Sequence, residues 1–140
     1  MAKFCIINPN DEKCYTYSRA RTRRIPLGQA YIAAALVMAG HDVSVIDATA
    51  DDLNEDDIVE RVVAIQPDFV GIGGTTPLYS QMASLTKKIK NELENVTVIL
   101  GGPHVSALPI PSLNTSMADF ICIGEAEESV VELLDNLEHN

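Results

Sequence analysis

The sequence predicts an α/β domain in which helices cover both faces of a five-stranded parallel sheet. Short, nearly continuous apolar runs alternate with longer segments of helical periodicity along the 140 residues, as expected where crossover helices join parallel strands. The apolar runs are rich in β-branched residues, which is typical of strands buried on both faces. A chain of this length supports one domain, and we assign that domain residues 1–140.

Five apolar runs define the predicted strands. Each run is four or five residues long, a length that suits a central strand better than a helix. Five strands that alternate with helices in a chain of this size predict a three-layer α/β/α, flavodoxin-like domain with the strand order 2-1-3-4-5. The predicted strands are residues 4–7, 43–46, 69–72, 96–100 and 119–123.

The first helix is predicted over residues 27–39, which are apolar almost all round. Such a composition is typical of a deeply packed helix. Gly40 follows at the place of a C′ glycine, which ends a helix in the left-handed conformation. His41 comes next, at the sheet edge opposite to the carboxyl ends of the strands, and we expect its side chain to be exposed.

The remaining helices are predicted by apolar stripes at helical spacing and by their first residues. Asn54 or a neighbouring aspartate is the expected cap of the second helix. Thr76–Pro77 is typical of a cap followed by proline at the first position of the third helix. Residues 103–118 are rich in proline, and we expect at most one short helix there. The stripes are Ile58, Val62 and Ile65 in the second helix, Leu78, Met82, Leu85, Ile89 and Leu93 in the third, and Val130, Leu133, Leu134 and Leu137 in the last.

The charge balance argues against several classes of function. With 20 acidic and 10 basic residues the net charge is −10, so phosphates would be repelled over most of the surface. This argues against a general nucleic-acid or membrane-surface binder. No apolar run approaches the roughly 18 residues of a membrane span, and we expect no signal peptide, because the apolar run after Lys3 is only four residues long.

The three cysteines, Cys5, Cys14 and Cys122, are spaced like neither a C-x-x-C motif nor a zinc site. Cys5 and Cys122 lie in apolar runs, so we expect both in the core. Free thiols fit the reducing cytoplasm, and we expect the protein there.

The loops that follow the strands are the places to look for a binding site, because ligands of such sheets bind beyond the carboxyl ends of the strands. Three of these loops begin with glycine, at Gly73, Gly101 and Gly124. Glycine allows a sharp turn and lets a ligand approach the main chain. Ordinary turn chemistry would explain any one of them, but three at one edge predict a groove with bare backbone walls.

Several known occupants of such an edge are excluded. The third strand ends in G-G-T-T, where a receiver domain needs an aspartate, and no flavodoxin-type phosphate loop or G-x-G-x-x-G follows the first strand. The loop over residues 8–25 is long enough to be functional. It carries Arg19, Arg21, Arg23 and Arg24, which either bind an anion or form a solvated loop that balances nearby acids.

Four segments, in order, resemble the cobalamin-binding domain at the N-terminus of cobalamin-dependent radical S-adenosylmethionine enzymes. The resemblance implies that the corrinoid binds over the carboxyl edge of the sheet and that its nucleotide tail runs down into the domain. The four segments are RIPLGQAYIAAALVMAGHDVSVIDA, PDFVGIGGTTPLYSQ, VILGGPHVSALP and ADFICIGEAEESV.

The resemblance also implies a set of cofactor-binding residues. Thr75 and Thr76 would place a hydroxyl against the lower base, although Thr76 could equally serve only as a helix cap. Glu125 could be no more than favourable charge at a helix N-terminus. The implied residues are Arg24, Ile25, Pro26, Leu27, Gly28, Gly73, Gly74, Thr75, Thr76, Leu78, Gly101, Gly102, Pro103, His104, Gly124 and Glu125.

Family members that supply a histidine to cobalt carry it in an Asp-x-His-x-x-Gly motif after the first strand. If Gly28 is that glycine, Ile25 occupies the histidine position and Arg23 the aspartate position. Isoleucine has no lone pair and arginine is a cation, so the resemblance implies base-off cobalamin without a protein histidine. His104 follows the fourth strand, and we interpret it as a contact to the corrin or tail rather than a ligand of cobalt.

The chain has no C-x-x-x-C-x-x-C motif for a 4Fe–4S cluster. We therefore expect the cluster and S-adenosylmethionine to bind in a further domain, in cis or in trans, of an enzyme such as a methyltransferase or cyclase, and no turnover from this chain alone. The alternatives are a corrin-free interaction or sensory module with the same fold, and an enzyme for a small anionic substrate held by the arginines. Replacing Gly102 by valine should crowd the tail groove with little effect on melting.

Overall fold

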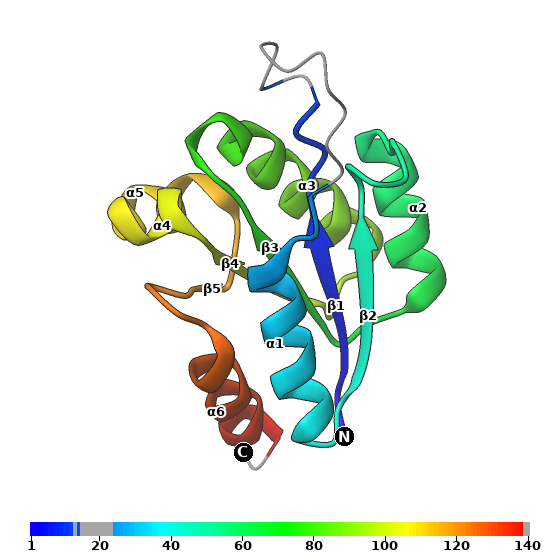
Figure 1. Cartoon of the computed structure of the whole chain (residues 1–140), viewed down its shortest axis with the longest axis vertical. Helices are drawn as coiled ribbons and strands as arrows, with labels where there is room; N and C mark the ends of the chain where they lie inside the picture. Colours follow the sequence, from blue (N-terminus) through cyan, green and yellow to red (C-terminus); the bar gives the residue numbers. More distant parts are fainter. Residues whose placement is uncertain (13, 15–23, 139–140) are drawn as a thin grey trace.

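Five parallel strands form one sheet in the order β2-β1-β3-β4-β5 in the computed structural model, which describes residues 1–12, 14 and 24–138 (Figure 1). The predicted fold class and strand order are therefore confirmed. β5 is shorter than predicted, because only two of its residues pair with β4. The strands are β1 (Lys3–Asn8), β2 (Asp42–Asp47), β3 (Phe69–Gly73), β4 (Thr97–Gly101) and β5 (Phe120–Ile121).

Helices cover both faces of the sheet. The helix α1 packs beside α6 on one face, while α2, α3 and α5 lie on the other (Figure 1). The helices are α1 (Leu27–Met38), α2 (Glu55–Ile65), α3 (Tyr79–Glu92), α4 (Pro103–Ala107), α5 (Pro109–Ser116) and α6 (Glu127–Glu138), and the short 3-10 helix η1 (Thr76–Leu78) precedes α3. Among these helices, none is both long and apolar enough to cross a membrane.

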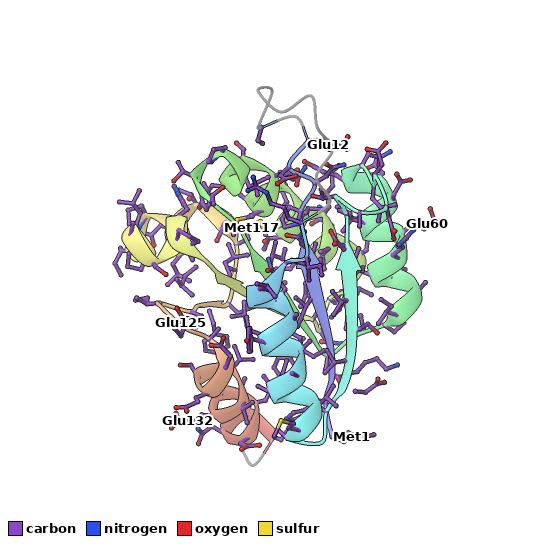
Figure 2. All side chains as sticks on the ribbon, viewed as in Figure 1. Met1, Glu12, Glu60, Met117, Glu125 and Glu132 are labelled. Atoms are coloured by element: carbon purple, nitrogen blue, oxygen red, sulfur yellow. The ribbon has the colours of Figure 1, made fainter. Side chains whose placement is uncertain are left out.

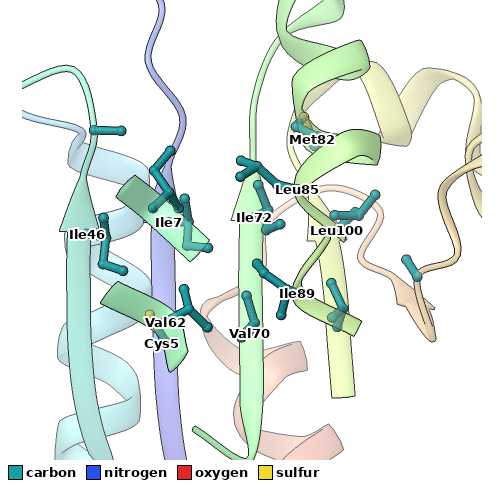
Figure 3. Packing of buried hydrophobic residues seen from close by; sticks show 14 of the residues in the cluster. Cys5, Ile7, Ile46, Val62, Val70, Ile72, Met82, Leu85, Ile89 and Leu100 are labelled. Carbon is teal, nitrogen blue, oxygen red and sulfur yellow. The ribbon is translucent and has the colours of Figure 1, made fainter. Parts of the chain in front are cut away.

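The larger apolar cluster fills the face covered by α2 and α3. Alternate residues of the central strands, such as Val70 and Leu100, meet Val62 of α2 and Leu85 of α3, and all four side chains are fully buried (Figure 3). Buried apolar area of this kind is the main source of stability in a domain of this size. This face is filled with side chains, whereas the opposite face is packed only in part.

Two of the predicted helix ends are confirmed. Gly40 has a φ of 90°, and the N–H groups of Gly40 and His41 donate to the carbonyls of Val37 and Leu36, which is a Schellman motif. At the start of α2, the side chain of Asn54 accepts from the N–H of Asp57, and the Asp57 carboxylate accepts from the N–H of Asn54. This reciprocal pair is a capping box.

The expectation that α1 is deeply packed is wrong. Leu36 is its single fully buried residue, while Leu27 and Tyr31 are each 64% exposed and Met38 is 88% exposed. The physical reason is position: α1 lies in an outer layer, so only one of its faces meets the sheet. A helix that is apolar on all sides can therefore still have one face exposed when no further layer of the domain packs on it.

Three smaller expectations are also corrected. His41 is buried, because its Nδ1 accepts a hydrogen bond from the backbone N–H of Ala2 at 3.2 Å. Residues 103–118 hold two helices, since Pro103 and Pro109 each begin one at a position where proline needs no donor. Thr76 does not cap α3, which begins at Tyr79 after η1.

Candidate functional site

A cavity of about 610 Å³ opens at the carboxyl edge of the sheet, on the face covered by α1 and α6. The ends of β1, β3 and β4 form one wall, and Gly28, Gln29 and Ile32 of α1 form a second. Val130 of α6 and the loop that precedes this helix close the third side. This volume lies in the range of small-molecule sites.

Glycine residues in the two central strands create the cavity. Side chains alternate between the two faces of a strand. On the face toward α2 and α3, β3 presents Val70 and Ile72 to the core, whereas on the opposite face it presents Gly71 and Gly73. Because β4 also ends in a glycine, Gly101, which lies beside Gly73 in the sheet register, no side chain fills this part of the face.

The bottom of the cavity is the ring of Phe4. A Cβ atom on Gly71 would lie 2.9 Å from Cε1 of this ring, which stacks on Phe69 with 6.1 Å between the ring centroids. This ring lies at the level of Gly71, which pairs with Ile6, two residues before the end of β1 at Asn8. At about 3.3 Å per residue, the cavity therefore reaches about 7 Å down the sheet.

Two glycine peptides form the wall at the mouth. Gly102 has a φ of 95°, and a Cβ atom on it would lie 2.8 Å from the carbonyl oxygen of Gly74 and 2.9 Å from its nitrogen. The loops after β3 and β4 thus touch through their main chains. A ligand at this edge would meet backbone, as the glycine pattern of the sequence predicts.

A hydrogen-bonded chain crosses the mouth from α1 to β2. The Nε2 of Gln29 donates to Oδ1 of Asn8 at 3.3 Å, and Nδ2 of Asn8 donates to Oδ1 of Asp47 at 2.9 Å. The same carboxylate oxygen accepts from the backbone N–H of Ala50 at 3.2 Å. These bonds orient both amide side chains, so the polar rim of the cavity is ordered by its own partners.

Charged groups lie around the opening rather than inside it. Arg24, Asp11, Glu125 and Glu127 all contribute to the lining, and Glu125 stands on the loop between β5 and α6 (Figure 2). Cys122, expected in the core, is only partly buried and also lines the cavity. Burial and the nearby Glu127 carboxylate raise the pKa of its thiol, so this group stays protonated near neutral pH.

Most of the residues that the sequence singles out line this cavity, and their role as cofactor contacts stays a prediction. Ile25, Pro26, Leu27, Thr76 and His104 do not line it. The arginine cluster falls largely outside the described residues, because Arg24 alone of its four members is described. The predicted residues in the lining are Arg24, Gly28, Gly73, Gly74, Thr75, Leu78, Gly101, Gly102, Pro103, Gly124 and Glu125.

His104 interacts with the elements beside it. Its Nδ1 lies 3.1 Å from Oγ1 of Thr76, and its ring stacks on Tyr79 with 4.3 Å between centroids. The hydroxyl of Tyr79 donates in turn to the carbonyl of Ser112 at 3.1 Å. The imidazole therefore joins the loop after β4 to the start of α3.

The lower half of the cavity consists of residues that the sequence reading missed. The pattern F-V-G-I-G-G contains the signal, because its alternate glycines mark one bare face when it is read with a period of two. The sheet register is needed to decide which face these glycines leave open and which side chains surround it. The residues missed include Phe4, Ile6, Asn8, Gln29, Ile32, Gly71, Ile99, Cys122 and Val130.

A doubly wound parallel sheet with a deep cavity at its carboxyl edge defines a domain that binds a small molecule at its topological switch point. Comparison with known proteins specifies the family. Residues 18–134 match the family described as B12 binding domain, which is most of the chain. The chain belongs to the B12-binding domain family.

Curated relatives include a methyltransferase and a cyclase that are much longer than this chain. An uncharacterised methyltransferase of Pyrococcus horikoshii is 40% identical over 113 residues, which are 80% of this chain and 24% of the methyltransferase. The anaerobic magnesium-protoporphyrin IX monomethyl ester cyclase of Synechocystis is 35% identical over 119 residues, 82% of this chain and 24% of the cyclase. The chain thus spans about a quarter of the length of these relatives.

Solved structures show the same fold. The radical S-adenosylmethionine methyltransferase TsrM from Kitasatospora setae, with cobalamin and a [4Fe-4S] cluster bound, superposes with a TM-score of 0.80 over 99% of this chain and 27% of TsrM, at 18% identity. At this identity the likeness concerns the fold alone. Part of this cobalamin-containing radical S-adenosylmethionine methyltransferase therefore has the same fold as the present domain.

Proposed function

We propose that this domain holds cobalamin in the base-off form, with the corrin over the carboxyl edge of the sheet and the nucleotide tail in the cavity. The observation that carries the proposal is the glycine-lined cavity: Gly73 and Gly101 present no side chain at the ends of the central strands, above the Phe4 ring that covers Gly71, while the opposite face is packed with buried side chains. A domain without a ligand on that face would be more stable with side chains there.

The described residues fit a corrinoid tail. The walls of the mouth are main chain at Gly74 and Gly102. A Cβ atom on Gly102 would collide with the main chain of Gly74, and bare peptides can approach a ligand closely. Below the mouth, Ile6 and Ile99 offer apolar contact to a base, and both are buried. The rim amides of Asn8 and Gln29 can meet the polar part of a tail.

The positions of the histidines support the base-off form. His41 lies at the end of the sheet opposite to the cavity mouth, and the imidazole of His104 stacks on Tyr79 beside Thr76. Ile25, at the position of the family's ligating histidine, is 76% exposed and has no atom that could coordinate cobalt. We infer that residues of this chain bind and orient the cofactor without a lone pair for the metal.

The longer methyltransferase and cyclase relatives support a role for this domain as one part of a larger enzyme. Bound cobalamin supplies a cobalt centre that can carry a methyl group or take part in radical chemistry. We propose that a radical S-adenosylmethionine domain, in cis or in trans, acts with this module in a methyltransferase or cyclase reaction. The chain itself then contributes the binding site and no reacting side chain.

The test is to incubate the purified chain with hydroxocobalamin, remove free ligand by gel filtration and record the visible spectrum. We expect retained corrin absorbance of the base-off type at neutral pH, where free cobalamin is base-on. A colourless protein would contradict cobalamin binding and favour a corrin-free module. A retained base-on spectrum would contradict the placement of the tail while leaving cobalamin binding intact.

A further inference from the structure

We propose that the lower part of the cavity selects corrinoids whose lower base is an apolar benzimidazole over corrinoids whose lower base is adenine. This inference rests on the proposed function and adds the chemical class of the preferred ligand. It is carried by five residues, named here the apolar floor: Phe4, Ile6, Gly71, Ile99 and Val130.

The apolar floor presents only carbon. The side chains of Phe4, Ile6, Ile99 and Val130 are each at most 4% exposed, and all four belong to the smaller apolar cluster. Gly71 lies between Ile6 of β1 and Ile99 of β4 in the register of the sheet. The Phe4 ring covers Gly71, so a flat base would lie above this ring, near the branched side chains of Ile6 and Ile99.

Several polar side chains of the cavity lining are engaged in hydrogen bonds. The Asn8 amide is bound to Gln29 and Asp47, and Oγ of Ser106 accepts from the N–H of Gly124 at 3.0 Å. In the described part of the chain, the buried side-chain atoms without a partner are His41 Nε2, Gln81 Oε1 and Ser112 Oγ, and none of these residues lines the cavity. The side chains of the apolar floor themselves carry no nitrogen or oxygen that could bond to a polar base.

Two common lower bases of corrinoids differ in how many polar groups they would bring into contact with the apolar floor. Dimethylbenzimidazole presents two methyl groups and a benzene edge, whereas adenine carries an exocyclic amine and further ring nitrogens that hydrogen-bond to water. Buried polar groups without partners are costly, and apolar groups in the same place gain from burial. We expect a preference for the benzimidazole of roughly 10- to 100-fold in affinity.

The experiment compares three ligands on the purified chain by absorbance titration: aquocobalamin, its adenine counterpart pseudocobalamin, and cobinamide, which lacks the base. We expect aquocobalamin to bind at least about tenfold more tightly than the other two. Equal affinity for aquocobalamin and pseudocobalamin, with cobinamide weaker, would overturn the selection but leave the proposed function standing. Equal affinity for all three would remove the tail from the cavity, and no binding of any would overturn both proposals.

A matched pair of variants locates the selection. Val130→Thr is nearly isosteric and adds a hydroxyl to the apolar floor, so it should reduce the preference for aquocobalamin several-fold. Val43→Thr makes the same change at a residue that packs against the same apolar cluster but does not line the cavity, and it should leave the preference unchanged. Ile99→Thr repeats the test if Val130→Thr does not fold. An unchanged preference in a folded Val130→Thr or Ile99→Thr variant would contradict the assignment.

Discussion

The residue Gly102 lies so close to Gly74 that a single added methyl group would collide with the main chain. A Cβ atom on Gly102 would be 2.8 Å from the carbonyl oxygen of Gly74, and the φ of 95° at Gly102 already disfavours any L side chain. This corrects the expectation that valine at position 102 would leave melting little changed. The contact that shapes the mouth of the cavity also contributes to the stability of the fold.

The first prediction separates these two effects. Gly40 has a similar φ of 90° but nothing within 4 Å of an added Cβ, so Gly40→Ala should lower the free energy of unfolding by about 1–2 kcal/mol through backbone strain alone. Gly102→Ala should lower it by about 2–4 kcal/mol, because backbone collision is added. The free energy of unfolding of both variants is measured by urea denaturation. Equal decreases in the two variants would show that the contact with Gly74 does not contribute to stability.

The second prediction concerns the bottom of the cavity. In Gly71→Ala the new methyl group would lie 2.9 Å from Cε1 of Phe4, so the ring must move, and the added atoms occupy space needed by a ligand. We expect cobalamin affinity to fall about tenfold or more, with a loss of about 1–3 kcal/mol in unfolding free energy. Adding Phe4→Leu should restore part of the affinity. Full affinity in the Gly71→Ala variant would show that the tail does not reach this depth.

The third prediction tests the role of His104. Because its ring is held by Thr76 and Tyr79, His104→Ala should leave the spectrum of bound cobalamin unchanged and lower stability by about 1 kcal/mol. Thr76→Val removes the same hydrogen bond and serves as the matched variant. A change in the spectrum of bound cobalamin that is confined to His104→Ala would identify this imidazole as a cobalt ligand.

The fourth prediction is a loss of stability at alkaline pH from Cys5. Burial raises the pKa of its thiol from 9.0 to about 12, so the thiol of the unfolded chain ionises first as the pH rises. The stabilising contribution is therefore complete below pH 9 and is lost between pH 9 and about 12, at up to about 1.4 kcal/mol per pH unit. Cys5→Val should show a shallower decline than the unmodified protein in urea unfolding above pH 9, and parallel declines would contradict the prediction.

The sheet could be predicted because its signals are local. Runs such as FVGIG, with β-branched residues and glycine at the end, predict a buried strand followed by a turn whatever surrounds them. The order of the strands then follows from the limited topologies of parallel sheets. The placement of α1 could not be predicted in the same way, because the exposure of Tyr31 and Met38 depends on which layers pack around this helix.

Some residues of the candidate site could likewise be predicted from local sequence signals, and others could not. The glycines at positions 73, 74, 101 and 102 are visible in the sequence, because glycines that follow several strands gather at one edge of a parallel sheet. Phe4 and Val130, in contrast, are ordinary apolar residues of a strand and a helix, and nothing local distinguishes them from the rest of the core. They line the same cavity only because the folded sheet and α6 bring them together, with the Phe4 ring packed on Gly71.

By itself, the sequence determined the class of the fold, the edge of the sheet where the cavity opens and the absence of a histidine at the position of Ile25. These properties depend on residue type and spacing along the chain. Only the tertiary structure decided the depth and lining of the cavity, the burial of His41 and the packing of His104 on Tyr79. Each of these depends on contacts between residues far apart in the sequence, and such contacts are settled by the register and packing of the whole domain.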